Sequence, residues 1–265
     1  MTNDFLLRNR GTVAVITGGT QGLGLAIAKR LALEGARGVA ISGRNSDKGE
    51  NAARSVRALG ADCLFVKADV SISDDCFRLV NTALEHFGSL NGLVNSAAAT
   101  DRGTLLDTSL ELWGRHFDTN VRGPFLTMQR LVKHLVETGS PGSIVNIISM
   151  AANCGQSYLT AYAASKGALA TLTKNVANAY AARRIRSNGI LLGWMDTPGE
   201  SLIQQKFHGA DQDWLAKAEA AQAMGQLVKP EQVAGLAAYM LSPESGVMTG
   251  ALVDYDQNVA GAYPE

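Results

Sequence analysis

Two tyrosines and a lysine recur at four-residue intervals in the segment SYLTAYAASK, residues 157–166. On an α-helix such positions lie on one face, so Tyr158, Tyr162 and Lys166 could line a single stripe. A free tyrosine, whose pKa is about 10, is a poor acid or base near neutral pH. A lysine ammonium one helical turn away favours the phenolate and lowers that pKa. The pattern therefore indicates a group that could exchange a proton with a reacting oxygen atom.

The spacing separates the roles of the two tyrosines. Tyr158 lies two turns before Lys166, which is about 12 Å along a helix axis and too far for direct coupling. Thr160 is a plausible N-cap, so we expect the regular helix to begin beyond Tyr158. We therefore assign proton transfer to Tyr162. Two interpretations stay open for Tyr158, namely a wall of a substrate pocket and ordinary packing.

These side chains need a scaffold, and the chain alternates short apolar runs with helical segments. The runs predict strands at 12–17, 38–43, 63–70, 90–97, 142–149, 185–193 and 250–255. Helical patterns lie between them at 24–36, 46–60, 73–88, 107–138, 161–182, 213–224 and about 230–241. Because the strands are apolar on both faces, we expect a parallel sheet with helices on both sides. Right-handed crossovers would make it doubly wound, with ligands at the carboxyl ends of its strands.

Local signals predict several boundaries. Ser73 is the expected N-cap of the third helix, and Gly88 lies past its end. Gly123-Pro124 is expected to bend the helical region at 107–138, and the stretch before residue 213 is expected to be mobile. No repeat or linker divides the chain, so we expect one α/β domain over residues 1–265 with about seven strands.

The composition excludes several classes of protein. The 24 basic residues balance 24 acidic ones and are scattered, so neither nucleic acid nor a membrane is an expected partner. No apolar run approaches the roughly 20 residues that span a bilayer, and the start has no signal-peptide core, so we expect cytoplasmic localisation. Cys63, Cys76 and Cys154 form no CxxC motif, and the four histidines form no ligand pair. We expect neither a metal site nor disulfides.

The segment TGGTQGLG, residues 17–24, follows the first strand and opens the first helix. Gly18, Gly22 and Gly24 would let the backbone turn tightly and approach a pyrophosphate, and the helix N-terminus supplies N–H groups with partial positive charge. A structural turn needs glycines too. Its position after the first strand of an alternating α/β chain favours nucleotide binding.

Further motifs follow in an order known from one family: DV at 69–70, NSAA at 95–98, TNVRGPF at 119–125, Ser149, and YAASK at 162–166. Together with the glycine turn they resemble the short-chain dehydrogenase/reductase family, whose patterns are TGxxxGxG, NNAG, TNxxGxF and YxxxK. The resemblance covers nearly the whole chain. It implies a Rossmann fold, a nicotinamide cofactor, interconversion of a secondary alcohol and a ketone with pro-S hydride transfer, and a homotetramer built on the long helices and the C-terminal strand.

The resemblance also implies roles for individual residues. Tyr162 would be the acid/base, Lys166 would also bind the nicotinamide ribose, and Ser149 would donate to the substrate oxygen. Asn120 would position a water in a proton relay through Lys166. Cofactor contacts are implied for Gly18, Thr20, Gln21, Gly22, Leu23, Gly24, Arg44, Asp69, Val70, Asn95, Ala97, Tyr162, Lys166, Gly193, Met195 and Thr197.

The end of the second strand, ISGRN at 41–45, bears on the choice of cofactor. Family members that prefer NAD carry Asp where this chain has Gly43. Arg44 suits a ribose 2′-phosphate by its charge and forked geometry. We therefore favour NADP(H), and NAD(H) is the alternative if Arg44 is only a solvated loop residue.

The chain departs from the family pattern at three places. Leu192 replaces the usual proline in LGWMDT (192–197), YDQN (255–258) replaces VDGG, and NSAA has alanine for glycine. We expect weaker rigidity rather than lost cofactor binding. The changes argue against a typical carrier-protein ketoreductase.

The region 194–225 corresponds to the variable substrate lid of the family. Three aromatic side chains of this region could form an apolar wall of a substrate pocket: Trp194, Phe207 and Trp214. Three polar side chains could bind substrate hydroxyls: Gln204, Gln205 and His208. All six could equally be ordinary packing or surface residues.

The alternatives to the favoured function are an NAD-dependent sugar or polyol dehydrogenase and a nucleotide-binding regulatory protein. The latter predicts a damaged catalytic set.

Overall fold

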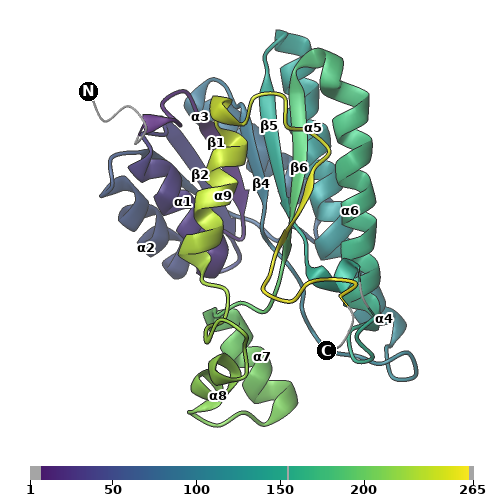
Figure 1. The fold of residues 1–265 in the computed structure, drawn as a ribbon. Helices are drawn as coiled ribbons and strands as arrows, with labels where there is room; N and C mark the ends of the chain where they lie inside the picture. The colour runs from purple at the N-terminus through teal and green to yellow at the C-terminus, as the bar shows by residue number, and fades with distance from the viewer. Residues whose placement is uncertain (1–6, 154, 263–265) are drawn as a thin grey trace.

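Seven parallel strands form one sheet at the centre of the molecule (Figure 1). The computed structural model describes residues 7–153 and 155–262. The strands are β1 (Val13–Thr17), β2 (Gly38–Gly43), β3 (Asp62–Lys67), β4 (Gly92–Asn95), β5 (Gly142–Ile147), β6 (Ile185–Leu192) and β7 (Leu252–Tyr255). Their spatial order is β3-β2-β1-β4-β5-β6-β7. The strand order reverses between β1 and β4, so the carboxyl ends of these two strands form the switch point at which such sheets bind ligands.

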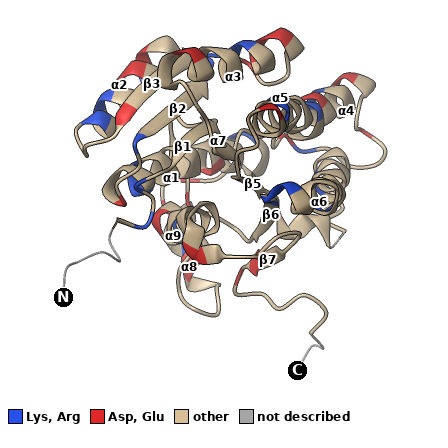
Figure 2. Cartoon of the chain, turned by 90° about the horizontal axis from the view of Figure 1, so that it is seen from above, with Lys and Arg blue, Asp and Glu red and all other residues tan. Residues whose placement is uncertain are grey.

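Helices cover both faces of the sheet (Figure 2). One face carries α1 (Gly22–Leu33), α2 (Ser46–Arg57) and α9 (Pro230–Leu241), and the other carries α3 (Ser73–Phe87), α5 (Gly123–Thr138) and α6 (Thr160–Tyr180). The side chains of β1 alternate between these layers. Ala14 and Ile16 belong to the core of the first, and Val13 and Val15 to the core of the second. This arrangement confirms the doubly wound sheet predicted from the apolar strands.

A third group of helices lies beyond the carboxyl ends of the strands, where α7 and α8 form a separate lobe (Figure 1). The group consists of α4 (Leu110–Phe117), α7 (Pro198–His208) and α8 (Trp214–Ala220). No residue of α7 is fully buried, and α8 buries only Ala218. Short helical turns complete the fold: a π-helical turn η2 (Asp118–Arg122) and the 3-10 turns η3 (Met150–Ala152), η4 (Ala181–Arg183) and η5 (Pro243–Ser245).

Two predicted N-caps are wrong by one position. Helix α3 begins at Ser73 itself, after Ile72, and no side chain caps it. Helix α6 begins at Thr160, after Leu159. The reason in the second case is a tertiary contact, because the Thr160 N–H donates to the carbonyl oxygen of Gly103 at 3.1 Å and fixes the chain where it enters the helix. Gly88 ends α3 with a left-handed φ of 78°, as predicted.

The region predicted as one bent helix at 107–138 is divided differently. Helix α4 ends at Phe117, the π-helical turn η2 follows, and α5 begins at Gly123. A Cβ at Gly123 would lie 2.6 Å from the carbonyl oxygen of Val70, so a glycine lets α5 begin close to the segment after β3. The stretch expected to be mobile before residue 213 contains α7.

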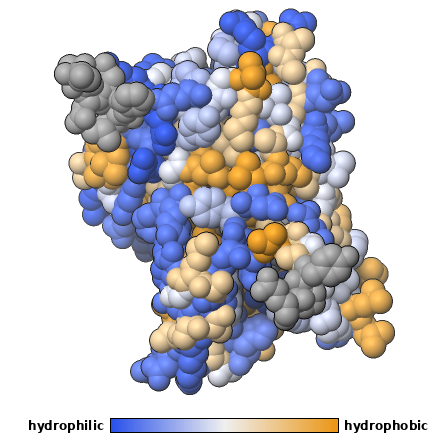
Figure 3. Space-filling view, viewed as in Figure 1, coloured by the Kyte–Doolittle hydropathy of each residue, from blue (hydrophilic) through white to orange (hydrophobic). Residues whose placement is uncertain are grey.

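Polar side chains dominate the face drawn in Figure 3, with apolar atoms gathered near its middle and at the end where α4 lies. Leu105, Leu106 and Leu110, before and at the start of α4, are 80%, 97% and 90% exposed. Basic and acidic residues are interspersed along α2 and α3 (Figure 2). Over the described ranges, no helix combines the length and apolar character needed to cross a membrane.

Candidate active site

Three separate segments bring the four catalytic candidates together beyond the carboxyl ends of β4 and β5. Ser149 follows β5 and caps η3, Asn120 lies in η2, and Tyr162 and Lys166 lie in the first two turns of α6. Helix α6 packs against both η2 and η3. The fold therefore assembles in space the four residues that the sequence singled out.

The hydroxyl groups of Tyr162 and Ser149 lie close enough to interact. Although Tyr162 is partly accessible, the dense surroundings desolvate its hydroxyl, and this burial raises the pKa of Tyr162. The nearby Ser149 hydroxyl works in the opposite direction because it favours the phenolate. The guanidinium of Arg102 also favours the phenolate, and the carboxylate of Glu200 opposes it. Tyr162 therefore carries its proton at neutral pH and holds it beside Ser149.

Lys166 is buried, with only 2% of its surface exposed. Its Nζ donates to the carbonyl oxygen of Ile147 at the end of β5 (2.8 Å) and lies 5.7 Å from the centroid of the Tyr162 ring. Burial lowers the pKa of Lys166 to about 8. The predicted neighbourhood of the two side chains is confirmed. The predicted fall in the pKa of Tyr162 is wrong for this structure, because desolvation outweighs the groups that favour the phenolate.

Asn120 is fully buried and tied to two neighbouring segments. Its Oδ1 accepts from the backbone N–H of Ala99 (2.8 Å), and its Nδ2 donates to the carbonyl oxygen of Ala99 (3.0 Å) and to Oγ of Ser165 (2.9 Å). Ser165 Oγ in turn donates to the carbonyl oxygen of Tyr162 at 2.7 Å. The π-helical turn, a feature often found at functional sites, thus fixes the start of α6 to the loop after β4.

A buried imidazole beside Tyr162 was not anticipated as part of the site. His116 is 1% exposed, and its ring packs edge-on against the Tyr162 ring with 6.1 Å between centroids. Neither ring nitrogen has a partner in hydrogen-bond geometry, although the backbone of Asp101 and Ala99 lies close enough to favour the protonated ring. Burial nevertheless lowers the pKa of His116. His116 lies four residues before Asn120, and on a helix this spacing places two side chains on one face. The sequence could have indicated His116 as a neighbour of the site by this spacing.

The glycine turn has the shape of a phosphate cradle. Gly18 and Gly22 have φ values of +68° and +52°, and a Cβ at Gly24 would lie 2.4 Å from the carbonyl oxygen of Gly18. Helix α1 then begins after Gln21 with no side-chain cap and no acidic residue in its first turn. Its first N–H groups are therefore left for an anion, which fits a dinucleotide pyrophosphate.

The loop after β6 reaches the same place. The ideal Cβ position of Gly22 lies 3.7 Å from the Thr197 side chain. Gly22 also lines a cavity of about 370 Å³ together with Asp196 and Pro198. The sequence predicted that the loops after β1 and β6 bind the cofactor, and in the structure these two loops lie at one location.

Comparison with known proteins agrees with this geometry. The family model described as enoyl-(acyl carrier protein) reductase matches residues 18–257. The chain is 34% identical over 245 residues to cis-4-hydroxycyclohexanecarboxylate dehydrogenase of Sinomonas cyclohexanicum, covering 92% of this chain and 94% of that protein. It is also 34% identical over 247 residues to the NADP-dependent (R)-specific alcohol dehydrogenase of Lentilactobacillus kefiri, with coverages of 92% and 94%. The solved short-chain dehydrogenase/reductase from Serratia marcescens BCRC 10948 aligns with a TM-score of 0.84 at 32% identity, covering 94% of this chain and 98% of that one.

The chain is a short-chain dehydrogenase/reductase. It belongs to a family of NAD(P)-dependent oxidoreductases that act on hydroxyl groups, and it interconverts a secondary alcohol and a carbonyl compound.

In this short-chain dehydrogenase/reductase the end of β2 lies close against the glycine turn. A Cβ at Gly43 would lie 2.6 Å from the Thr20 side chain, so an acidic residue at position 43 would collide with it. Arg44 is exposed, and no hydrogen bond or ion pair joins it to any described residue. Lys48, which the sequence analysis missed, donates to Oε1 of Gln21 at 3.3 Å. Two cations therefore flank the point where β2 meets the glycine turn.

The other predicted cofactor residues differ in how their side chains are used. Asp69 accepts hydrogen bonds from the backbone and hydroxyl of Ser71 (3.0 and 2.7 Å), and Val70 is buried. Asn95 is buried, with its amide bonded to Asn146 and Thr127, so a contact to a cofactor would come from its backbone. Ala97 packs directly behind Gly18, and Leu23 points into the core.

The loop after β6 is braced despite Leu192 in place of proline. Met195 bridges to Val228, and the Asp196 N–H donates to the Val228 carbonyl oxygen at 3.0 Å. The Thr197 hydroxyl accepts from the Glu200 N–H at 3.0 Å and caps α7. A Cβ at Gly193 would lie 2.0 Å from the Asp256 carboxylate, so the YDQN segment lies directly behind this loop.

Side chains of α7 and of the loop after β4 form a polar cluster around Tyr158. The ring of Tyr158, which precedes α6 as predicted, packs edge-on against His208 of α7 and lies 5.8 Å below the Arg102 guanidinium. Arg102 is also 3.4 Å from Glu200, and both side chains are about 15% exposed. The sequence analysis missed both residues, although Glu200 stands three positions after the capping threonine, in the spacing of a capping box.

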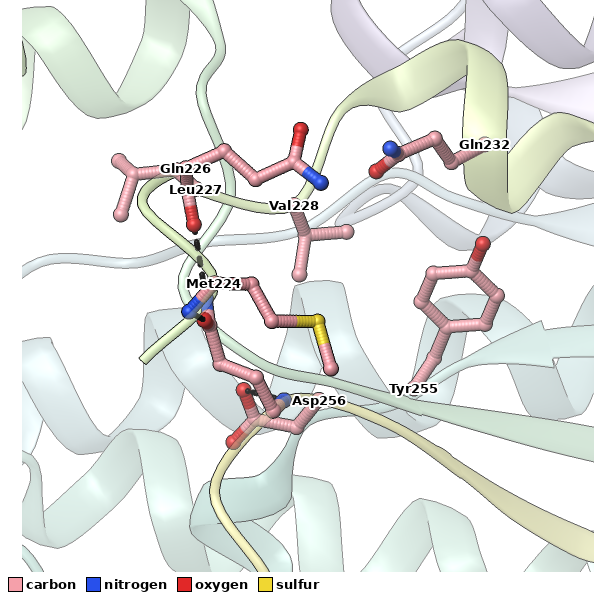
Figure 4. A pocket seen from close by; sticks show the side chains of 8 residues that line it. Met224, Gln226, Leu227, Val228, Gln232, Tyr255 and Asp256 are labelled. Carbon is pink, nitrogen blue, oxygen red and sulfur yellow. Dashed lines mark hydrogen bonds between the residues drawn. The ribbon is translucent and has the colours of Figure 1, made fainter. Parts of the chain in front are cut away.

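A pocket of about 170 Å³ lies on the far side of the Gly193 loop, between Met224, Tyr255 and Asp256 (Figure 4). Gln257 closes one end by accepting from the Met224 N–H (2.7 Å) and donating to the Gln226 carbonyl oxygen (2.7 Å). None of the four catalytic candidates lines it.

Proposed function

We propose that this enzyme uses NADP(H) to interconvert a secondary alcohol and a ketone, with Tyr162 as the acid/base. The observation that carries the proposal is the placement of Tyr162 beside Ser149 and one helical turn before the buried Lys166, whose Nζ lies 5.7 Å from the Tyr162 ring centroid. Oxidation of a secondary alcohol removes a hydride from carbon and a proton from oxygen. The hydride passes to the nicotinamide, which is the chemistry that the bound cofactor supplies. The proton passes to the protein.

Tyr162 and Ser149 would both contact the reacting oxygen. In the direction of reduction, a protonated Tyr162 gives its proton to the oxygen as the carbonyl becomes an alcohol. Ser149 Oγ donates a hydrogen bond to the same oxygen and stabilises the negative charge that develops there. The raised pKa of Tyr162 keeps the phenol protonated near neutral pH, which suits reduction. In oxidation the same group must first lose its proton.

Lys166 and Asn120 would support that proton transfer. An ammonium has three N–H donors, and the bond to Ile147 uses one of them, which leaves donors for a ribose and for a relay. With a pKa of about 8, Lys166 is mainly charged at neutral pH and favours the phenolate once Tyr162 has given up its proton. Asn120 would hold a water that continues the relay, by resemblance to the family.

Arg44 and Lys48 support NADP(H) over NAD(H). Arg44 follows β2 directly and Lys48 lies in the first turn of α2 against Gln21, and Arg44 has a guanidinium free to take a phosphate in two hydrogen bonds. The Lentilactobacillus kefiri relative is NADP-dependent by name. Position 43 is a glycine, where an Asp would otherwise select the ribose hydroxyls of NAD.

The geometry of the site does not favour the two other candidate functions. The hypothesis of a sugar or polyol dehydrogenase depends on glutamine and histidine side chains of the lid that would bind substrate hydroxyls. In the structure Gln204 donates to Glu200, and His208 packs against Tyr158. A regulatory nucleotide-binding protein would have a damaged catalytic set, whereas all four residues are present and adjacent.

We also propose a homotetramer, since β7 is an edge strand of the sheet and Trp113 and Phe125 are 40% and 43% exposed. Light scattering would measure its mass.

The test is a panel of secondary alcohols and ketones assayed with NADP(H) and NAD(H) by nicotinamide absorbance. The proposal expects turnover of at least one pair, with the higher kcat/KM for NADP(H). Tight cofactor binding with no turnover across the panel would instead support the regulatory protein. Turnover only with NAD(H) would refute the choice of cofactor and leave the reaction intact.

A further inference from the structure

We propose that Arg102 binds a carboxylate of the substrate, so that this enzyme acts on hydroxy acids and keto acids. The inference rests on the proposed function, because it names the substrate class of that site. Arg102 lies in the loop after β4, and its charge acts on the hydroxyl of Tyr162. Its guanidinium also lies over the ring of Tyr158, 5.8 Å from the centroid. A group bound to Arg102 would therefore lie beside the catalytic tyrosine.

The guanidinium has unused hydrogen-bonding capacity in a poorly hydrated place. Nη1 donates to the carbonyl oxygen of Thr100 (3.0 Å), and Nη2 to Oε1 of Glu200 at a long 3.4 Å. Nε is buried and has no partner. An arginine carries five N–H donors in a fork that matches a planar carboxylate, so this side chain can take a further anion.

Glu200 is held mainly by other groups. Its Oε1 accepts from Nε2 of Gln204 at 2.7 Å and from Nε1 of Trp194 at 2.9 Å, and the contact from Arg102 is the longest of the three. Glu200 therefore keeps its place on α7 when Arg102 turns toward a ligand. It orients the guanidinium but does not saturate it.

The charges around Arg102 favour a monoanion. Asp101 is paired with Lys206 (3.2 Å) and with Arg115 (3.5 Å), so no free acidic group from this loop competes for Arg102. Together the cluster has three cations, Arg102, Lys206 and Arg115, against the two anions Asp101 and Glu200. One positive charge remains. That balance fits a carboxylate better than a phosphate dianion.

A purely structural role is the competing explanation, in which Arg102 only ties the β4 loop to α7. Such a tie would affect all substrates alike. A carboxylate anchor affects acids and leaves their neutral analogues unchanged. Levulinate and its next two homologues provide the comparison, because each keto acid has a primary amide of nearly the same shape.

The experiment measures kcat and KM for each acid and amide with NADPH, in the wild type and in four variants. The wild type should prefer the best acid over its amide by about tenfold or more, since hydrogen bonds to charged groups are strong. Arg102→Ala should remove this preference by raising KM for the acid, while kcat/KM for the amide changes by less than about threefold. Arg102→Lys should keep part of the preference for the acid. Glu200→Gln should increase the preference for the acid. Arg54→Ala, the matched loss of an exposed guanidinium on α2 outside this cluster, should preserve it.

Three outcomes would overturn the assignment: equal kcat/KM for acid and amide in the wild type, an equal fall for both in Arg102→Ala, or a preference for a matched phosphonate. If no compound is turned over, the proposed function fails, and binding still tests Arg102. Levulinate should then raise the Tm of the wild type in the presence of NADP more than levulinamide does, and Arg102→Ala should lose that difference. Equal shifts for acid and amide would refute the anchor.

Discussion

At the scale of single residues, desolvation decides the protonation of the site. Burial lowers the pKa of Lys166 to about 8 and raises that of Tyr162, so both groups lean toward their neutral forms. The charged forms that turnover requires are then stabilised by particular partners. The carbonyl oxygen of Ile147 accepts from the ammonium, and the Ser149 hydroxyl lies beside the phenol and favours the phenolate. Strand β5 and the segment after it position these two partners, and α6 positions Tyr162 and Lys166 one helical turn apart beside them.

Arg44 provides the prediction on cofactor choice. Arg44→Ala removes the guanidinium that we assign to the 2′-phosphate, so kcat/KM with NADP should fall by about tenfold or more while kcat/KM with NAD stays nearly constant. Arg54→Ala is a matched control, because Arg54 is an exposed arginine further along α2. An unchanged NADP/NAD ratio in Arg44→Ala would show that Arg44 is a solvated loop residue.

At the scale of elements, the sequence predicted those helices and strands that have a strong hydrophobic pattern within their own residues. The apolar strands and the long amphipathic helices have this pattern along their whole length. The π-helical turn at Asp118–Arg122 does not, because it arises from the bonds of Asn120 to Ala99 and Ser165 in other segments. Helix α7 carried local start signals in Thr197 and Pro198. Its lack of buried residues left no apolar stripe to find.

Thr197 links this helix to function, since its hydroxyl caps α7 at the N–H of Glu200. Thr197→Ala should cost about 1 kcal/mol of helix stability and loosen the turn that carries Glu200. We expect KM for substrate to rise several-fold, together with a lower Tm. Ser109→Ala removes the equivalent cap of α4 and serves as the control, with a similar loss of Tm and a smaller change in KM. Equal KM effects of the two substitutions would contradict a specific role of the α7 cap.

At the scale of the whole molecule, the sequence predicted the doubly wound sheet and the meeting of Asn120, Ser149, Tyr162 and Lys166. Both follow from the order of strands, because parallel strands deliver their following loops to one edge. The partners of Tyr162 that lie on other loops could not be predicted in the same way. Arg102 and Glu200 are more than 90 residues apart, and only the packing of α7 over the β4 loop brings them together.

Buried His116 makes the stability of the whole fold depend on pH. Burial lowers its pKa below the usual 6.5, so the unfolded chain binds a proton more readily than the folded one. The stability is fully present above 6.5 and is lost as the pH falls from there through the folded pKa. His116→Leu should therefore gain Tm relative to the wild type as the pH is lowered from about 8 to 5. His134→Leu, at a half-buried histidine of α5, should gain less, and a gain independent of pH would contradict this explanation.

The most direct test of the proposed mechanism is the turnover of Tyr162→Phe beside that of Tyr158→Phe. Tyr162→Phe removes only the proton-carrying hydroxyl, so kcat should fall by about 10²–10⁴-fold while NADPH binding, followed by cofactor fluorescence, stays nearly unchanged. Tyr158→Phe should keep kcat and mainly alter KM, because Tyr158 lies against Arg102 and His208 at the lid. An active Tyr162→Phe enzyme, or an inactive Tyr158→Phe enzyme, would contradict the assignment of Tyr162 as the acid/base.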